Sequence, residues 1–211
     1  MRVIVGMATT NARLDFCKLA VSSLIHQVDE IHVYNNDNEQ QDLTDNGKFY
    51  FLQLYKEPIY YFSCDDDILY PPNYVEDMIN GIGRTGGIVT HHGRKLLGKN
   101  RNYYRGHQGF RCLDDNDKEQ VIDVAGTGVT AFRTDYFNPV ELWKSKDKRM
   151  SDLVFSLEAA RNKKQITILP HKRGWLKDLR VPSALQISVM ERRNTRQNEV
   201  ANIICDVKGI S

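Results

Sequence analysis

Hydrophobic and polar positions alternate in blocks at the start of the chain. Residues 2–8, "RVIVGMA", form a continuous apolar run with β-branched side chains, which is typical of a strand buried on both faces. The segment after it begins with polar residues and then keeps Leu14, Cys17 and Leu24 roughly on one side, which predicts a helix. Residues 31–34 give a second strand. This order predicts a right-handed, parallel βαβ unit.

The rest of the chain continues this pattern of strands and helices. Further strands are predicted at 58–64 and in "GGIVTHHG", "EQVIDVAGTGVTAFRTDYF" and "QITILPHKRGW". Helices are predicted in "LTDNGKFYFL", "PPNYVEDMINGI", "MSDLVFSLEAARNKK" and most of 183–207. Residues 94–118 are polar and aromatic with little periodicity, so we expect an irregular, functional or mobile stretch. We predict an α/β fold with a mainly parallel twisted sheet flanked by helices.

Composition and charge exclude several classes of protein. The chain has 211 residues, of which 41% are hydrophobic and 27% charged, as in soluble globular domains. A formal charge of +2 gives no argument for nucleic acid. No stretch approaches the ~20 apolar residues of a membrane span. The four cysteines are scattered and form no C-x-x-C pair, which indicates free thiols in a reducing compartment. We expect a soluble, cytoplasmic protein without nucleic-acid binding or membrane insertion.

Polar clusters follow several of the predicted strands. In open α/β sheets, ligands bind beyond the carboxyl ends of the strands. Carboxylates suit hard cations such as Mg²⁺ and Mn²⁺, and an added histidine favours Mn²⁺. Two carboxylates ~6 Å apart repel by roughly 3 kcal/mol at an effective dielectric of about 20, which a bound cation would relieve. A solvated acidic turn is the alternative. The clusters are Asp65-Asp66-Asp67, Thr9-Thr10-Asn11, Asn35-Asn36-Asp37 and His171.

The segment "YYFSCDDDILYPPNYVEDMI" resembles the D-x-D segment of GT-A glycosyltransferases, with the strand, the acidic triplet, the prolines and the helix in order. "VIVGMATTNAR", "YNND" and "NGKFYF" are similar to the nucleotide-binding half of that fold, which is Rossmann-like. "AGTGVTAFRTDYF", "SDLVFSLEAA" and "ILPH" resemble its acceptor-side elements. Within the family, the chain looks most similar to the glycosyltransferase domain of a chlorovirus (large algal virus) multidomain protein, which would make it an excised domain.

This resemblance implies the domain organisation and the activity. It implies one GT-A domain over 1–211, with a nucleotide-binding half (1–93), an acceptor-side half (94–182) and a helical tail (183–211). The implied activity is metal-dependent transfer of a hexosyl group from a UDP-sugar to a glycan or glycoprotein acceptor, in viral glycan synthesis in the host cytoplasm. "KNRNYYRGHQGF" offers aromatic and hydrogen-bonding groups for the acceptor, although a loop without function fits equally well.

The resemblance also implies roles for individual residues around a Mn²⁺ or Mg²⁺ ion. Asp67 would bind the metal that bridges the two phosphates, and His171 would complete the metal shell or touch a phosphate, although an ordinary surface histidine is the alternative. Asp65 would face the ribose beside the metal, and Asp66 the sugar or a metal-bound water. Lys48 would pair with a phosphate or be solvated.

The remaining implied residues surround the nucleotide and the sugar. Thr9, Thr10 and Arg13 would line the nucleotide, with Asn36 and Asp37 near the uracil; helix capping and a simple turn are the alternatives. Asp152 matches the position of the catalytic base in inverting members, but an N-cap or first-turn acid is as good an interpretation. A close approach to the sugar, or alternatively a β-bulge, is the expectation for Gly126, Thr127 and Gly128.

Three other functions fit parts of the sequence. A HAD-type phosphohydrolase would use Asp65 as nucleophile and Asp67 as acid or base, with Mg²⁺ alongside and "GGIVT" as a second motif. Against it, a complete βαβ unit precedes the motif. A non-catalytic nucleotide-sugar-binding module would keep the same residues without turnover. A nucleotidyltransferase would need a glycine-rich segment after the first strand, and "GMATTNAR" is poor in glycine.

Overall fold

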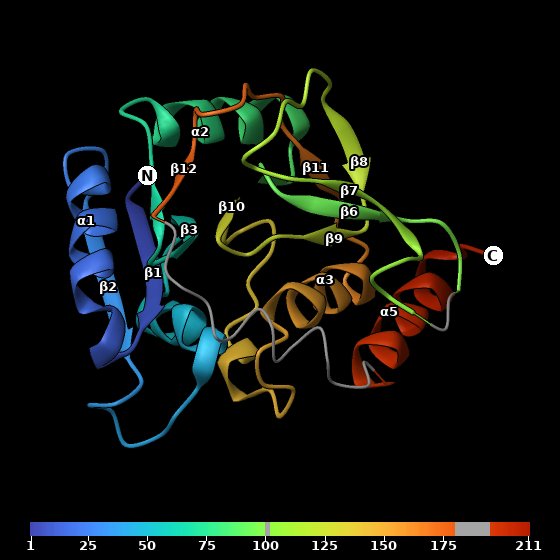
Figure 1. Ribbon diagram of the computed structural model, residues 1–211, viewed down its shortest axis with the longest axis horizontal. Helices are drawn as coiled ribbons and strands as arrows, with labels where there is room; N and C mark the ends of the chain where they lie inside the picture. Colours follow the sequence, from blue (N-terminus) through green and yellow to red (C-terminus); the bar gives the residue numbers. More distant parts are fainter. Residues whose placement is uncertain (100–101, 180–194) are drawn as a thin grey trace.

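The computed structural model describes residues 1–99, 102–179 and 195–211. The apolar run at the amino terminus forms β1 (Val3–Thr9), which pairs in parallel with β2 (Glu30–Asn35) and with β3 (Tyr60–Asp65). Helix α1 (Leu14–Leu24) connects β1 to β2 (Figure 1). The predicted βαβ unit is therefore confirmed. The carboxyl ends of the three strands lie at one edge of the sheet.

The central sheet has seven strands in the order β2-β1-β3-β10-β5-β11-β8. Strand β10 (Val129–Arg133) lies antiparallel between β3 and β5 (Ile88–Thr90). Strand β11 (Ile166–Ile168) runs parallel to β5, and β8 (Gln120–Ile122) is antiparallel to β11. The fold is thus α/β, as expected. The sheet is mostly parallel, with β10 and β8 running in the opposite direction. Because β10 enters between β3 and β5, the turn before it lies next to the acidic triplet.

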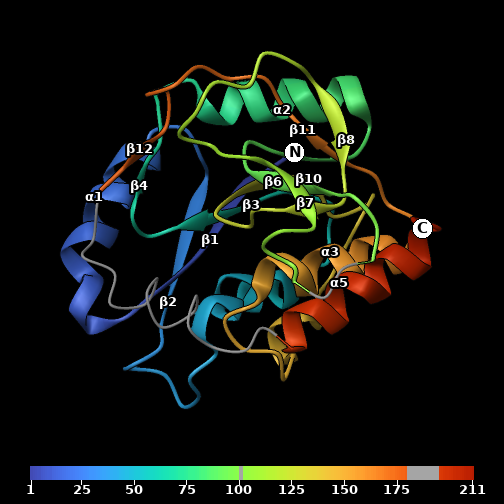
Figure 2. The same cartoon turned by 45° about the vertical axis from the view of Figure 1, so that its right-hand side comes forward.

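Side chains of the sheet alternate between two cores. On one face, Val5 and Met7 pack with α1 and with α2 (Tyr74–Thr85). On the other face, Ile4 packs with the 3-10 segment η2 (Thr44–Leu54) and with α3 (Ser151–Arg161). The alternation follows from the period of two in a strand and explains why β1 is apolar at nearly every position. Figures 1 and 2 show helices on both sides of the sheet.

The stretch that we expected to be irregular contains strands. Strand β6 (Gly93–Leu96) pairs antiparallel with β7 (His107–Phe110) and with β9 (Val124–Ala125), which makes a separate three-stranded sheet. The strand predicted in "GGIVTHHG" is confirmed as β5, but it covers only part of that segment, because the chain leaves the central sheet after Thr90 and enters the small sheet at Gly93. Short strands with glycine and alternating polar residues carry too little periodicity to be recognised locally.

Helix α5 (Thr195–Lys208) ends the chain and packs on α3 through Val200, Ala201 and Ile204. This confirms the predicted helical tail for residues 195–208, whereas residues 183–194 lie outside the described residues. The remaining elements are short: η1 (Asn11–Arg13), η3 (Leu142–Lys144), β4 (Ile68–Leu69) and β12 (Lys177–Asp178). Within the described parts of the chain, no helix has the length and apolar character needed to cross a membrane.

Candidate functional site

A cavity of about 1120 Å³ opens at the carboxyl ends of β1 and β3. A smaller cavity of about 270 Å³ adjoins it, and Asp45, Lys48 and Asp65 line both. The larger one is bordered by residues of the amino-terminal half and by the small sheet, and the smaller one by the start of α3. The two cavities together form one cleft, in which charged side chains lie among apolar surface, as expected for a ligand site at this edge of an α/β sheet.

Arg13, which follows β1, reaches across the cleft edge to two carboxylates of the triplet. Its Nε donates to Asp66 Oδ2 at 2.9 Å, its Nη2 lies 2.5 Å from Asp66 Oδ1, and the same Nη2 is 2.8 Å from Asp67 Oδ2. Thr9 Oγ1 donates to Asp66 Oδ2 at 2.7 Å. The hydrogen bonds to Asp66 raise the pKa of Arg13 above its ordinary value. Asp66 is also buried. Both of its carboxylate oxygens accept hydrogen bonds, so Asp66 connects Thr9 and Arg13 to the end of β3.

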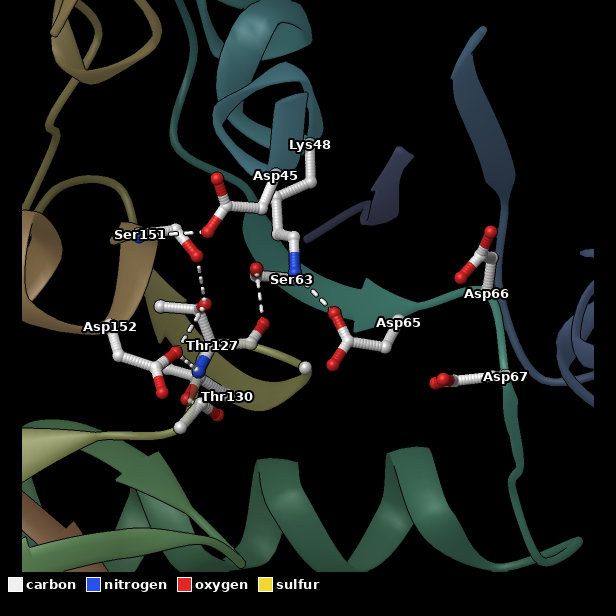
Figure 3. Close-up of polar contacts among 12 residues, drawn as sticks. Asp45, Lys48, Ser63, Asp65, Asp66, Asp67, Thr127, Thr130, Ser151 and Asp152 are labelled. Atoms are coloured by element: carbon white, nitrogen blue, oxygen red, sulfur yellow. Dashed lines mark hydrogen bonds and ion pairs between the residues drawn. The ribbon is translucent and has the colours of Figure 1, made fainter. Parts of the chain in front are cut away.

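Lys48, from η2, pairs with the remaining carboxylate, Asp65 (Figure 3). The lysine side chain is only 4% exposed, whereas that of Asp65 is 41% exposed. Burial alone would lower the pKa of Lys48, but the nearby Asp65 and Asp45 carboxylates raise it above its ordinary value. Lys48 is thus a charged, buried partner of Asp65.

The triplet keeps two oxygens that fit a divalent cation. Among contacts within the described residues, Arg13 uses Oδ2 of Asp67 and Lys48 uses Oδ1 of Asp65, which leaves the second oxygen of each carboxylate without a hydrogen bond. Burial and the Asp65 charge raise the pKa of Asp67, in spite of Arg13. Mg²⁺ and similar ions are commonly held by one or two carboxylates together with substrate phosphates. Asp65 and Asp67 therefore fit a divalent cation.

The histidine that we expected in the metal set lies elsewhere. His171 is 7% exposed, so the alternative of a surface histidine is wrong. Its Nδ1 lies 3.3 Å from His91 Nδ1 and 3.2 Å from the Leu169 carbonyl oxygen, and its Nε2 is 3.2 Å from the Arg111 carbonyl oxygen. Within the described parts of the chain, no cluster of three or more His, Cys, Asp or Glu is arranged to hold a metal. The structure does not bring His171 to Asp65 and Asp67.

Asp152 lies in the first turn of α3 and lines the smaller cavity. Its Oδ1 accepts hydrogen bonds from the Thr127 N–H and Oγ1, both at 2.8 Å (Figure 3). Its Oδ2 lies 3.8 Å from Arg94 Nη1. The N-cap is Met150, so the N-cap alternative is wrong and the first-turn position is confirmed. The helix N-terminus stabilises the negative charge of Asp152.

Gly126 and Gly128 flank Thr127 in the turn between β9 and β10, and both are closely covered. A Cβ on Gly128 would lie 2.0 Å from Asp65 Oδ2. A Cβ on Gly126 would lie 2.7 Å from Cβ and Cδ2 of His92. The turn is also tied to β3, because Ser63 Oγ donates to the Thr127 carbonyl oxygen at 2.5 Å. Glycine is needed here because other side chains occupy the space of a Cβ.

The other predicted residues divide between the cavity wall and the structure behind it. Thr9, Thr10, Arg13 and Asn36 line the larger cavity. Asn36 also bridges two loops, since its Nδ2 donates to the carbonyl oxygens of Thr9 and Thr44. Asp37 is absent from the described lining, and its Oδ2 accepts the Asn11 N–H at 2.6 Å. The turn interpretation therefore accounts for Asp37.

Several lining residues escaped the sequence analysis because they reach the cleft from outside the strand ends. Aromatic and basic side chains of residues 94–111 form one wall, as "KNRNYYRGHQGF" suggested in part. Their aromatic and cationic character was the only signal in the sequence. Arg149 has φ 58, a left-handed backbone that is uncommon outside glycine. Tyr103, Tyr104, His107, Gly109 and Phe110 belong to "KNRNYYRGHQGF". The missed residues are Asp42, Thr44, Asp45, His92, Gly93, Arg94, Arg111, Asp114, Asp115, Arg149, Met150, Ser151, Leu153 and Gln197.

Comparison with known proteins gives only distant structural similarity. No protein-family model and no curated protein sequence matches the chain. The crystal structure of A197 from STIV is 13% identical over 84% of each chain, with a TM-score of 0.43. The inositol-1-phosphate CTP transferase from T. maritima is 14% identical, with a TM-score of 0.38, over 97% of this chain and 77% of that one. These values are too low to assign a family or an activity, so any assignment must come from the site itself.

Proposed function

We propose that this protein is a metal-dependent glycosyltransferase that moves a hexosyl group from a UDP-sugar to a glycan hydroxyl, in viral glycoprotein glycan synthesis. One observation carries the proposal: Asp65 and Asp67, each with one oxygen that makes no hydrogen bond within the described residues, line a cleft that also contains a separate carboxylate, Asp152. Asp65 and Asp67 suit the binding of a diphosphate with its cation, and Asp152 suits the role of a base.

The donor would lie in the larger cavity, between β1, β3 and the small sheet. Asp67 and Asp65 would hold Mn²⁺ or Mg²⁺, which when bound offsets the charge that develops on the leaving diphosphate. Arg13 keeps Asp66 and Asp67 in place, and Lys48 does the same for Asp65. Because the Arg13 and Lys48 side chains already bind the three carboxylates, the carboxylates are in position before the ligand arrives.

The acceptor hydroxyl would enter through the smaller cavity and meet Asp152. Its oxygen would form a bond to the anomeric carbon while the bond from that carbon to the diphosphate oxygen breaks. The hydroxyl proton would pass to Asp152 Oδ2, since Oδ1 already accepts two hydrogen bonds from Thr127. The products are the glycosylated acceptor, UDP and protonated Asp152, which later returns its proton to water.

An activity assay separates this proposal from its rivals. The protein with Mn²⁺ would be incubated with UDP-glucose, UDP-galactose and UDP-N-acetylglucosamine, with and without oligosaccharide acceptors, and UDP release measured. We expect UDP release from one donor, lost on addition of EDTA. Hydrolysis of para-nitrophenyl phosphate without UDP release would instead support the phosphohydrolase. Donor binding without any turnover would support the non-catalytic module.

A further inference from the structure

His92 occupies the bend where the chain passes from β5 to β6, and it lines the larger cavity. Its backbone carbonyl oxygen accepts two hydrogen bonds, from the Gly126 N–H at 2.7 Å and from Thr90 Oγ1 at 2.9 Å. The sequence analysis gave this residue no role, and the mechanism above does not use it.

The imidazole ring of His92 is held on both flanks. On one flank, Cδ2 and Cγ lie over Gly126, where a Cβ would come within 2.8 Å of both atoms. On the other flank, the Cys112 N–H donates a long hydrogen bond of 3.4 Å to Nδ1. The far end of the ring, with Nε2, makes no hydrogen bond within the described residues and is not among their fully buried polar atoms without a partner. Among the described residues, the ring is therefore positioned without a hydrogen-bond partner for Nε2.

The hydrogen bond at Nδ1 determines the tautomer of His92. When Nδ1 accepts a backbone N–H, a neutral imidazole carries its proton on Nε2. Burial lowers the pKa of His92, in spite of the nearby Asp152 carboxylate, so the neutral form is favoured. The cleft consequently contains a fixed N–H donor, which can serve an oxygen of a ligand but cannot accept the proton of the acceptor hydroxyl.

The turn from Gly126 to Gly128 brings this donor close to both carboxylate sites. The ring of His92 lies on Gly126, Asp65 lies on Gly128, and the Thr127 N–H between them holds Asp152. A sugar placed between Asp65 and Asp152 would thus lie beside the His92 ring. On the basis of the function proposed above, we propose that His92 donates a hydrogen bond from Nε2 to a hydroxyl of the transferred hexose and so helps to select the donor sugar.

The test compares the affinity for UDP-hexoses with that for UDP. Calorimetry with Mn²⁺ would measure UDP, UDP-glucose and UDP-galactose binding to the wild type, His92→Phe, His92→Leu and His92→Gln. Loss of one hydrogen bond predicts about 10-fold weaker binding of the preferred UDP-hexose in the Phe and Leu variants, with unchanged UDP affinity. Glutamine retains an N–H donor and should restore much of the loss. His26→Gln, at an exposed position outside the cleft lining, is the control.

The possible results distinguish this inference from the proposed function. Equal losses for UDP and the UDP-hexose would overturn the inference, because His92 would then contact the nucleotide or support the fold. Unchanged UDP-hexose affinity would also overturn it, as would a wild type that binds UDP and both UDP-hexoses equally. A wild type that binds neither UDP nor UDP-hexoses would contradict the proposed function itself.

Discussion

At the carboxyl end of β3 the carboxylates are bound directly by Arg13 and Lys48. At the start of α3 the carboxylate of Asp152 instead accepts its hydrogen bonds from the neutral Thr127, and the nearest cation, Arg94, lies 3.8 Å away. Arg13 and Lys48 reduce the charge of the triplet and bury part of it. Thr127 leaves the charge of Asp152 intact and one of its oxygens free of hydrogen bonds within the described residues. Three neighbouring carboxylates repel one another, so the folded state needs cations beside them. A general base must instead keep its negative charge. The environment of Asp65–Asp67 therefore suits binding, and that of Asp152 suits accepting a proton.

The largest expected effect comes from removing the charge of Asp152. Asp152→Asn keeps an oxygen for the two Thr127 hydrogen bonds, so the fold and UDP binding should be preserved. Loss of a general base should lower kcat by roughly 10²- to 10⁴-fold. Asp15→Asn changes another first-turn acid, in α1, and should leave kcat unchanged. A kcat of Asp152→Asn close to that of the wild type would show that Asp152 is not the general base.

The next largest effect is a loss of folding stability when the cation beside Asp65 is removed. Lys48→Met removes a buried ammonium and leaves Asp65 without its partner. Breaking a fully buried pair costs 3–5 kcal/mol, but Asp65 is partly exposed, so we expect about 1–3 kcal/mol from urea unfolding. Lys144→Met, which removes an exposed pair with Glu141, should cost less than about 0.5 kcal/mol. Equal costs would show that the cation does not stabilise the triplet.

A smaller effect is expected from the turn between the two sites. Gly128→Ala places a methyl group against Asp65 Oδ2 and must displace that carboxylate. We expect about 10-fold weaker Mn²⁺-dependent UDP binding by calorimetry, corresponding to about 1.4 kcal/mol. Gly83→Ala in α2 meets no atom within 4 Å and should leave binding unchanged. If both variants bind UDP like the wild type, the position of Asp65 does not depend on this turn.

The smallest expected effect concerns the histidine beside His92 in the sequence. His91 is 0% exposed, and burial lowers its pKa. The unfolded chain therefore takes up a proton near pH 6.5 that the folded chain resists, so stability is lost as the pH falls through that value. Urea midpoints at pH 7.5 and 5.5 should show the loss, and His91→Phe should reduce it. The same pH dependence in both proteins would show that other groups are responsible.

The local pattern of apolar and polar residues predicted most of the fold of residues 1–93 and little of the opposite wall of the cleft. The βαβ unit and the position of Asp65–Asp67 at the carboxyl end of β3 followed from apolar runs and their polar ends. The antiparallel insertion of β10 between β3 and β5 leaves no local signature, because strand order depends on distant pairing. The contact between Arg13 and Asp66 spans 53 residues, and its geometry is a property of the folded sheet. For the same reason, His92 could not be recognised from its neighbours in the sequence.

The role of the triplet as a cation site is the central claim, and calorimetric titration of UDP tests it most directly. The titrations would use the wild type and Asp67→Asn, each with Mn²⁺ and with EDTA. We predict UDP binding that requires Mn²⁺ in the wild type and that is largely lost in Asp67→Asn. UDP binding that is equal with Mn²⁺ and EDTA, and equal in the two proteins, would contradict the cation site and leave a nucleotide cleft without it.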